Sequence, residues 1–170
     1  MNRCCLDLST GAFGRLATRQ GGFTLIEAMV VVGLLAILAA MAMPSFTGAI
    51  ASHRVNSAAQ ELQTLLQFAR AEAVYHRTQI TVAPTSSQKW QATNSIKVLR
   101  EASLSDIVSI TAASTNGVVF SVEGQAKPAS GSAPYKVSIS ATNASRVQCL
   151  SVIGTGLVRL QTVAAGQTCP

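Results

Sequence analysis

The sequence predicts an α+β protein in which a long, bent N-terminal helix packs on an antiparallel β-sheet body. Two patterns predict the helix: residues 23–43 form an apolar run, and apolar residues then recur at helical spacing from Val55 to Ala73. A third pattern predicts the sheet, because short β-branched runs separated by turn residues follow His76. The 170 residues leave room for one modest domain and an anchor.

The apolar run 23–43 is long enough to cross a membrane. It carries a single charge, Glu27, and as a helix it would span about 31 Å, close to the thickness of the hydrocarbon core of a bilayer. Arg15 and Arg19 precede the run. The positive-inside tendency then keeps residues 1–22 in the cytoplasm and exports the C-terminal body.

An ordinary secretory signal is the alternative interpretation of this run. Such a signal ends in small residues on the far side of its apolar stretch, and the alanine-rich residues 39–42 would offer a cleavage site. The run is longer than a usual signal core, however, and it leads directly into a further helical pattern. We therefore expect it to be retained as a membrane-spanning helix.

The helical pattern resumes after Pro44, a residue that kinks or interrupts helices. An apolar stripe lies along one face and polar residues occupy the other. The stripe consists of Val55, Ala58, Ala59, Leu62, Leu65, Leu66, Ala69 and Ala73. We expect one long, bent helix from about Phe23 to about His76, with the stripe lying on the sheet.

Seven runs rich in β-branched residues predict the strands of the body. Breaks rich in Gly, Pro, Ser or Asn separate them, and the longest break, residues 124–134, is expected to be a mobile surface loop. Trp90, the sole tryptophan, is expected to pack under a loop. The expected strands are Gln79–Ala83, Ile96–Glu101, Ile107–Ala112, Val118–Glu123, Tyr135–Ala141, Arg146–Ile153 and Leu157–Thr162.

The cysteines fit an exported body. Cys4 and Cys5 lie in the leader, which leaves Cys149 and Cys169 as the only pair in the exported part. Export favours a disulfide between them, and closing a loop of about 20 residues contributes about 3 kcal/mol in the chain-entropy model. Two unpaired thiols are the alternative. Neither pair has the spacing of zinc ligands, so no metal site is expected.

No catalytic set of residues emerges from the sequence. Glu72 and His76 lie four residues apart on the predicted helix, but nothing supplies a third member, and a surface pair is the simpler interpretation. A Gly-rich phosphate loop and a nucleophile elbow are both missing from the sequence. We therefore expect neither an enzyme nor a cofactor.

The sequence from Gly21 to Glu27, GGFTLIE, resembles the processing site of type IV prepilins and type II secretion pseudopilins. The resemblance implies cleavage between Gly22 and Phe23 by a prepilin peptidase, with methylation of the amine freed at Phe23. It implies that Gly22 is the required small residue. The chain then divides into a leader (1–22), a transmembrane and filament-core helix (23–46) and a periplasmic body (47–170).

Glu27 needs a partner, because a carboxylate inside a spanning helix costs about 2–3 kcal/mol or more. The amine freed at Phe23 is the obvious cation. The resemblance implies that Glu27 meets the N-terminal amine of a neighbouring subunit and sets the register as the subunit leaves the membrane. A carboxylate that merely snorkels toward the helix end is the alternative.

Pro44 falls where pilins carry their helix-bending proline, so the close resemblance covers residues 21–46. The long helix, strand-rich body and late cysteine pair are similar to the GspH/FimT/FimU group of minor pilins and pseudopilins. This resemblance implies a subunit that primes assembly or sits at a filament tip. Its partners would be prepilin peptidase, other pilin or pseudopilin subunits and the bacterial inner membrane. A type IV pilus and a type II secretion pseudopilus both stay open.

DNA binding is a further alternative, because FimT-like minor pilins of naturally competent bacteria are associated with DNA uptake. Cations without nearby carboxylates can contact phosphates through salt-sensitive, sequence-independent contacts. The DNA-binding branch of this group has a motif similar to Gly-Arg-x-Arg near the C-terminus. Residues 156–159 of this chain read GLVR, so one of the two arginines of that motif is missing. A solvated basic face is the simpler interpretation. After Glu123 the chain has no acidic residue, and its cations are Lys127, Lys136, Arg146 and Arg159.

Overall fold

The computed structural model describes residues 22–131 and 134–170, with the backbone alone for 42–45. The expected cytoplasmic leader, except Gly22, therefore lies outside the described residues, as do Cys4, Cys5, Arg15 and Arg19. The chain divides into two compact units, residues 1–40 and 41–170. The predicted long helix is confirmed as α1 (Leu25–His76), which contributes to both units.

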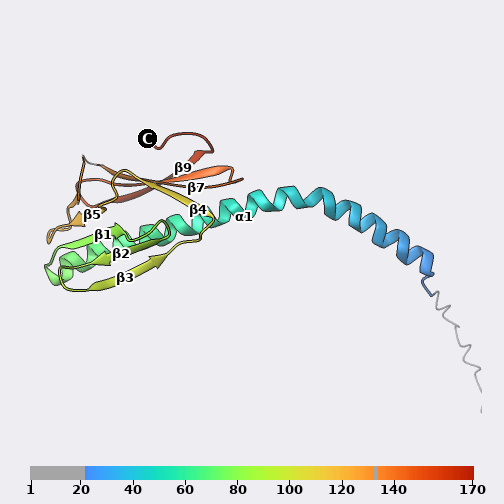
Figure 1. Cartoon of the computed structure of the whole chain (residues 1–170), viewed down its shortest axis with the longest axis horizontal. Helices are drawn as coiled ribbons and strands as arrows, with labels where there is room; N and C mark the ends of the chain where they lie inside the picture. Colours follow the sequence, from blue (N-terminus) through green and yellow to red (C-terminus); the bar gives the residue numbers. More distant parts are fainter. Residues whose placement is uncertain (1–21, 132–133) are drawn as a thin grey trace, which may run out of the picture. The chain divides into compact units, whose positions relative to one another are not determined.

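The second unit contains two antiparallel sheets, with strand orders β3-β2-β1-β5-β6 and β4-β7-β8-β9. Figure 1 shows the C-terminal part of α1 running along both of them. The fold class predicted from the sequence is confirmed. The strands are β1 (Ile80–Pro84), β2 (Lys89–Thr93), β3 (Val98–Ser103), β4 (Val108–Ala112), β5 (Val118–Phe120), β6 (Ala126–Pro128), β7 (Tyr135–Ala141), β8 (Arg146–Val152) and β9 (Val158–Ala164).

Two strands differ from the prediction. β2 was not predicted because its sequence, KWQAT, holds one β-branched residue; pairing of Trp90 with Pro84 on β1 and Ala102 on β3 makes it a strand. β6 lies inside the segment predicted to be a mobile loop, and it pairs with β5 through Phe120 and Ala126. Trp90 is a buried packing residue, as expected, and it lies on β2.

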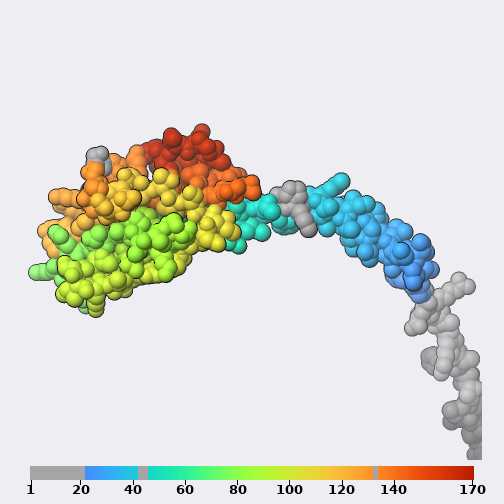
Figure 2. Space-filling view, in the orientation of Figure 1, coloured from blue at the N-terminus to red at the C-terminus, as the bar shows by residue number. Residues whose placement is uncertain are grey.

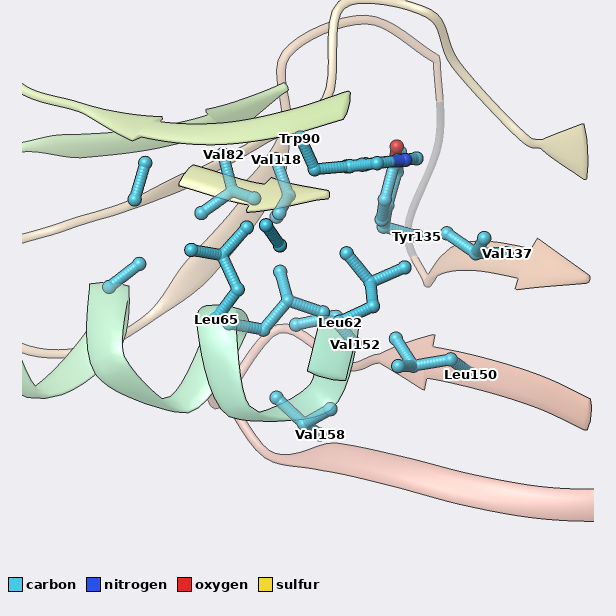
Figure 3. Close-up of a cluster of buried hydrophobic side chains, with 14 of the residues drawn as sticks. Leu62, Leu65, Val82, Trp90, Val118, Tyr135, Val137, Leu150, Val152 and Val158 are labelled. Atoms are coloured by element: carbon cyan, nitrogen blue, oxygen red, sulfur yellow. The ribbon is translucent and has the colours of Figure 1, made fainter. Parts of the chain in front are cut away.

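The predicted apolar stripe of α1 forms the helical side of the hydrophobic core. Every residue of that stripe is buried, and the stripe packs into one cluster with side chains from both sheets. Figure 3 shows Leu62 and Leu65 directed toward Val82 and Val118 of the first sheet. The second sheet contributes buried residues to the same cluster, among them Leu150. The helix therefore holds the two sheets together.

The predicted disulfide between Cys149 and Cys169 is confirmed, with a Cα–Cα distance of 5.5 Å. Cys149 lies on β8, and Cys169 is the penultimate residue of the chain. The bond ties the C-terminal tail to the second sheet. On β8, Gln148 and Leu150 are the inward-facing neighbours of Cys149, so Cys149 lies on the outer face of the sheet. It is buried there all the same.

Arg70 of α1 joins the two sheets at the distal end of the body, by which we mean the end where α1 stops at His76. Its Nε donates to the carbonyl oxygen of Gly124, and its Nη2 donates to that of Thr155, each over 3.1 Å. Gly124 follows β5 and Thr155 follows β8, so one side chain connects a turn of each sheet to the helix. Gly156, next in the chain, is buried against Gly124 and has a φ of +78°.

Replacing Gly156 by alanine is expected to lower the free energy of unfolding by about 2 kcal/mol or more. The φ angle is one that side chains rarely adopt, and the new Cβ would collide with the carbonyl oxygen of Gly124. Gly154→Ala is the matched control, since open space surrounds its Cβ position. Urea unfolding of residues 46–170 measures both variants. Equal stability of the two would contradict the role assigned to this contact.

Candidate functional site

Three of the residues predicted for processing and assembly lie at the start of α1: Gly22 and Phe23 precede the helix, and Glu27 lies in its first turn. Thr24 caps the helix, because the Glu27 backbone N–H donates to Thr24 Oγ1 over 3.3 Å and the Ala28 N–H donates to the Thr24 carbonyl over 3.2 Å. Threonine followed three residues later by glutamate is the capping-box spacing. The cap fixes the start of the helix at Leu25. The Gly22–Phe23 bond therefore lies outside the helix, exposed on both sides.

Gly22 is not required by the fold of this chain. A Cβ placed on it meets nothing within 4 Å, and its φ is not in the left-handed region. A larger side chain would fit here without strain. A need for glycine at this position can therefore come only from a molecule that binds the segment.

The Glu27 carboxylate has no hydrogen-bond or ion-pair partner within the described part of the chain. It lies in the first turn of α1, where the positive end of the helix dipole favours a negative charge. In water, the helix dipole and the solvent stabilise this charge without a partner. In an apolar environment they do not, because burial of an unpaired carboxylate there costs more free energy than the dipole supplies.

The segment that carries Glu27 is exposed over its whole surface. Every side chain from residue 22 to residue 41 is exposed, and Figure 2 shows this segment in blue at the molecular surface. A helix that is apolar on all sides needs lipid or neighbouring helices around it. The large apolar side chains are Phe23, Leu25, Ile26, Met29, Val30, Val31, Val32, Leu34, Leu35, Ile37, Leu38 and Met41.

Length and composition alone give a limited statement about membrane crossing. No single described helix meets the combined criterion of length and hydropathy for a bilayer span. Leu25–Met41 and Phe46–His76 meet it when they are taken together. Pro44 lies between these stretches, and its side chain is outside the described ones, so its predicted role stays a prediction.

Comparison with known proteins identifies the family. Residues 17–43 match the prokaryotic N-terminal methylation motif, and residues 58–156 match the model of type II transport protein GspH. The second match covers more than half of the chain. The chain belongs to the GspH family. The motif match spans three of the residues predicted for processing and assembly, Gly22, Phe23 and Glu27, and ends one residue before the fourth, Pro44. The sequence-based assignment to minor pilins and pseudopilins is thereby confirmed.

Solved structures share the fold of this GspH-family chain. The type IV minor pilin FimU of Pseudomonas aeruginosa has a TM-score of 0.55 at 21% identity, covering 64% of this chain and 89% of FimU. The minor pseudopilin EpsH of the type 2 secretion system of Vibrio cholerae has a TM-score of 0.50 at 13% identity, covering 67% of this chain and 99% of EpsH. A comparison with curated proteins gave no significant match.

The four cations predicted for DNA binding do not share one surface of the GspH-family body. Lys136 and Arg159 both pair with Ser151, on β7 and β9, so their side chains lie on the same outer face of the second sheet. Lys127 is on β6, in the first sheet. Arg146, the first residue of β8, lies five residues before Ser151. Because side chains alternate between the two faces of a strand, Arg146 lies on the opposite face of the sheet. The four strands of the second sheet contain no carboxylate.

Two carboxylates of the body, Glu72 and Glu101, take part in surface pairs. Glu72 and His76 approach to 3.4 Å, as expected for a pair four residues apart on a helix. The pKa of Glu101 is lowered, mainly by a 2.7 Å hydrogen bond from Gln91 and also by the nearby Lys89 ammonium. Burial raises the pKa of the Tyr135 phenol to about 12. Within the described residues, no three His, Cys, Asp or Glu side chains gather as a metal site.

Thr24 was not singled out from the sequence. Its cap leaves the Gly22–Phe23 bond, the predicted cleavage site, just outside the helix and presents Glu27 in the first turn. The signal was available in the sequence, since Thr24 and Glu27 have the spacing of a capping box.

Proposed function

We propose that this GspH-family chain is a minor subunit of a bacterial type IV pilus. It is cleaved after Gly22, methylated on Phe23, held in the inner membrane by its first helix, and then packed by that helix inside the filament. The observation that carries this proposal is the Glu27 carboxylate, which has no partner among the described residues and lies in the first turn of α1, at the start of an exposed apolar stretch. The amine freed at Phe23 of a neighbouring subunit is its partner.

The same apolar surface of the helix lies in the membrane before assembly and inside the filament afterwards. Lipid tails and a bundle of neighbouring apolar helices are similarly apolar, so transfer from one to the other carries no large hydrophobic penalty. Pairing of Glu27 with an amine then favours the filament over the membrane, because the hydrocarbon core of the bilayer offers the carboxylate no cation. The C-terminal body lies in the periplasm, where the oxidising environment suits the Cys149–Cys169 disulfide.

Filaments sheared from the native host test this proposal. The chain is expected in the filament fraction at a small fraction of the amount of the main subunit, and its deletion is expected to reduce filament number. A chain found solely in membranes, with filaments unchanged by the deletion, would contradict the proposal.

A type II secretion pseudopilus is the second candidate filament, favoured by the family match to type II transport protein GspH. The same leader, cleavage site and helix would serve there. The two candidates differ in the phenotype of the deletion. Loss of surface pili with normal secretion supports the pilus, whereas retained pili with exoproteins trapped in the periplasm support the pseudopilus.

DNA binding is a third candidate, supported by the row of Lys136 and Arg159 on a sheet without carboxylates. If it is correct, the double variant Lys136→Gln/Arg159→Gln of the body from about residue 52 onward should bind DNA more weakly. Its salt dependence should fall by about two phosphate contacts. Lys127→Gln/Arg146→Gln removes the same charge from other faces and is the matched control. Absence of binding by the unmodified body at low salt would remove the hypothesis.

A further inference from the structure

The proximal end of the body, where α1 enters it at Phe46–Ser52, presents apolar side chains that no described residue covers. Phe46, Ile50 and Ile107 are exposed by 64%, 54% and 47%. Phe46 and Ile50 are four residues apart on α1 and therefore share a helix face. Ile50 and Ile107 line the same groove of about 260 Å³, together with Arg54. Segments far apart in the sequence thus build one apolar surface.

Hydrogen bonds hold the loops of this surface against α1. The backbone N–H of Ser145 donates to Ser52 Oγ over 3.2 Å, and Arg54 Nη1 donates to Ser105 Oγ over 3.2 Å. Ser105 lies two residues before Ile107, so the second contact ties the backbone near that isoleucine to α1.

Chain connectivity determines how far this end lies from the bilayer. The apolar run ends at residue 43 within α1, and Phe46 and Ile50 follow it by three and seven residues. At about 1.5 Å per residue, Phe46 and Ile50 follow the end of the run by about 5 and 10 Å. The headgroup layer on each side of the hydrocarbon core is roughly 5–8 Å thick. An inserted span thus brings Phe46 into this layer and Ile50 to its outer edge.

We propose that the proximal end docks in the headgroup layer of the membrane that holds the span, with Phe46, Ile50 and Ile107 as apolar anchors. The proposal rests on the function proposed above, because it requires an inserted span. Lipid is the occupant because connectivity brings it to this surface in every subunit that awaits assembly. Arg54, at the rim of the groove, suits the lipid phosphates.

Docking has a consequence for assembly. A docked body has a fixed orientation on the membrane before it is extracted. Extraction must then release the three apolar side chains from the headgroup layer in addition to the span. The proximal end becomes available to a neighbouring subunit only after that release.

The distal end offers a matched control for the test. Ile96 lies in the turn between β2 and β3 and is exposed by 91%, more than Ile107. Thr93, at the end of β2, pairs with Thr81, which follows the C-terminal end of α1, so this turn belongs to the distal end. Ile96 therefore reports what an exposed isoleucine does when it is remote from the span.

The experiment uses the full chain with Cys4 and Cys5 replaced by serine, at one copy per nanodisc of phosphatidylethanolamine and phosphatidylglycerol. A nitrobenzoxadiazole label is attached to Ile107→Cys or Ile96→Cys. The emission of each label is measured with and without lipids that carry a nitroxide on the headgroup. A label on Ala36→Cys reports whether the span is inserted. Trp90 fluorescence verifies that each variant is folded, and Ile50→Cys provides a second proximal position.

The label at position 107 is expected to shift its emission to the blue and to lose most of its fluorescence to the nitroxide lipid. The label at position 96 is expected to show neither change. Equal behaviour at 107 and 96, with the label at 36 buried, overturns the docking and leaves the proposed function intact. A water-exposed label at 36 overturns both. Shielding of 107 that requires two copies per disc makes this surface a subunit contact and overturns the lipid proposal.

Discussion

Replacing Gly22 by leucine is expected to leave the full-length precursor uncut in its native host. The structure places no constraint of its own on this position, because a Cβ at Gly22 meets nothing within 4 Å. The substitution therefore leaves the folded chain unchanged and acts on recognition by the peptidase. The expected effect is an almost complete loss of the mature form. Gel mobility and intact mass of the membrane fraction measure it.

Gly33→Leu is the control for this substitution. Gly33 lies in the same exposed helix and also has open space around its Cβ position, so the change in side-chain size is the same. Cleavage of the Gly33 variant should be normal. Appearance of the mature size in the Gly22 variant would remove the claim that this chain is processed between residues 22 and 23.

Replacing Glu27 by valine is expected to preserve membrane insertion and to reduce incorporation into filaments tenfold or more. Insertion is preserved because removal of a carboxylate from an apolar helix favours the membrane by about 2–3 kcal/mol. Incorporation falls because the valine offers nothing to the amine of the neighbouring subunit, and about 1.4 kcal/mol of lost pairing already corresponds to a factor of ten. Quantitative blotting of sheared filaments against membranes measures the ratio.

Glu61→Val controls for the removal of a carboxylate from α1. Glu61 is an exposed residue of the same helix, but it belongs to the body and lies well outside the apolar run. Its replacement should leave incorporation unchanged. Normal incorporation of the Glu27 variant would show that the carboxylate has no part in assembly and that its place at the helix end is incidental.

The helix and the core stripe were predictable because their signals are local and strong. Spacings of three and four residues from Val55 to Ala73 identify the buried face of α1 without knowledge of its partner. The predicted disulfide followed from the topology of export, which left Cys149 a single partner. The seven expected strands all correspond to strands of the structure, with shifts of a few residues at their ends.

The remaining features depend on pairing between distant segments. β2 and β6 have weak β-propensity and are strands because β1 and β5 supply their hydrogen bonds. The division into two sheets follows from the pairing of the strands. A single sequence does not reveal that pairing. The proximal surface depends on a groove that Ile50 and Ile107 line together, and the separation of Lys136 from Arg146 depends on the register of β7 and β8.

Intact-mass spectrometry of the protein from its native host is the decisive measurement, because it shows whether the apolar N-terminal helix begins at a methylated Phe23. We expect one species that begins at Phe23, carries a single added methyl group on its N-terminus, retains the entire apolar run and contains the Cys149–Cys169 disulfide. A species that still carries the leader, or one that begins after residue 43, would contradict this expectation.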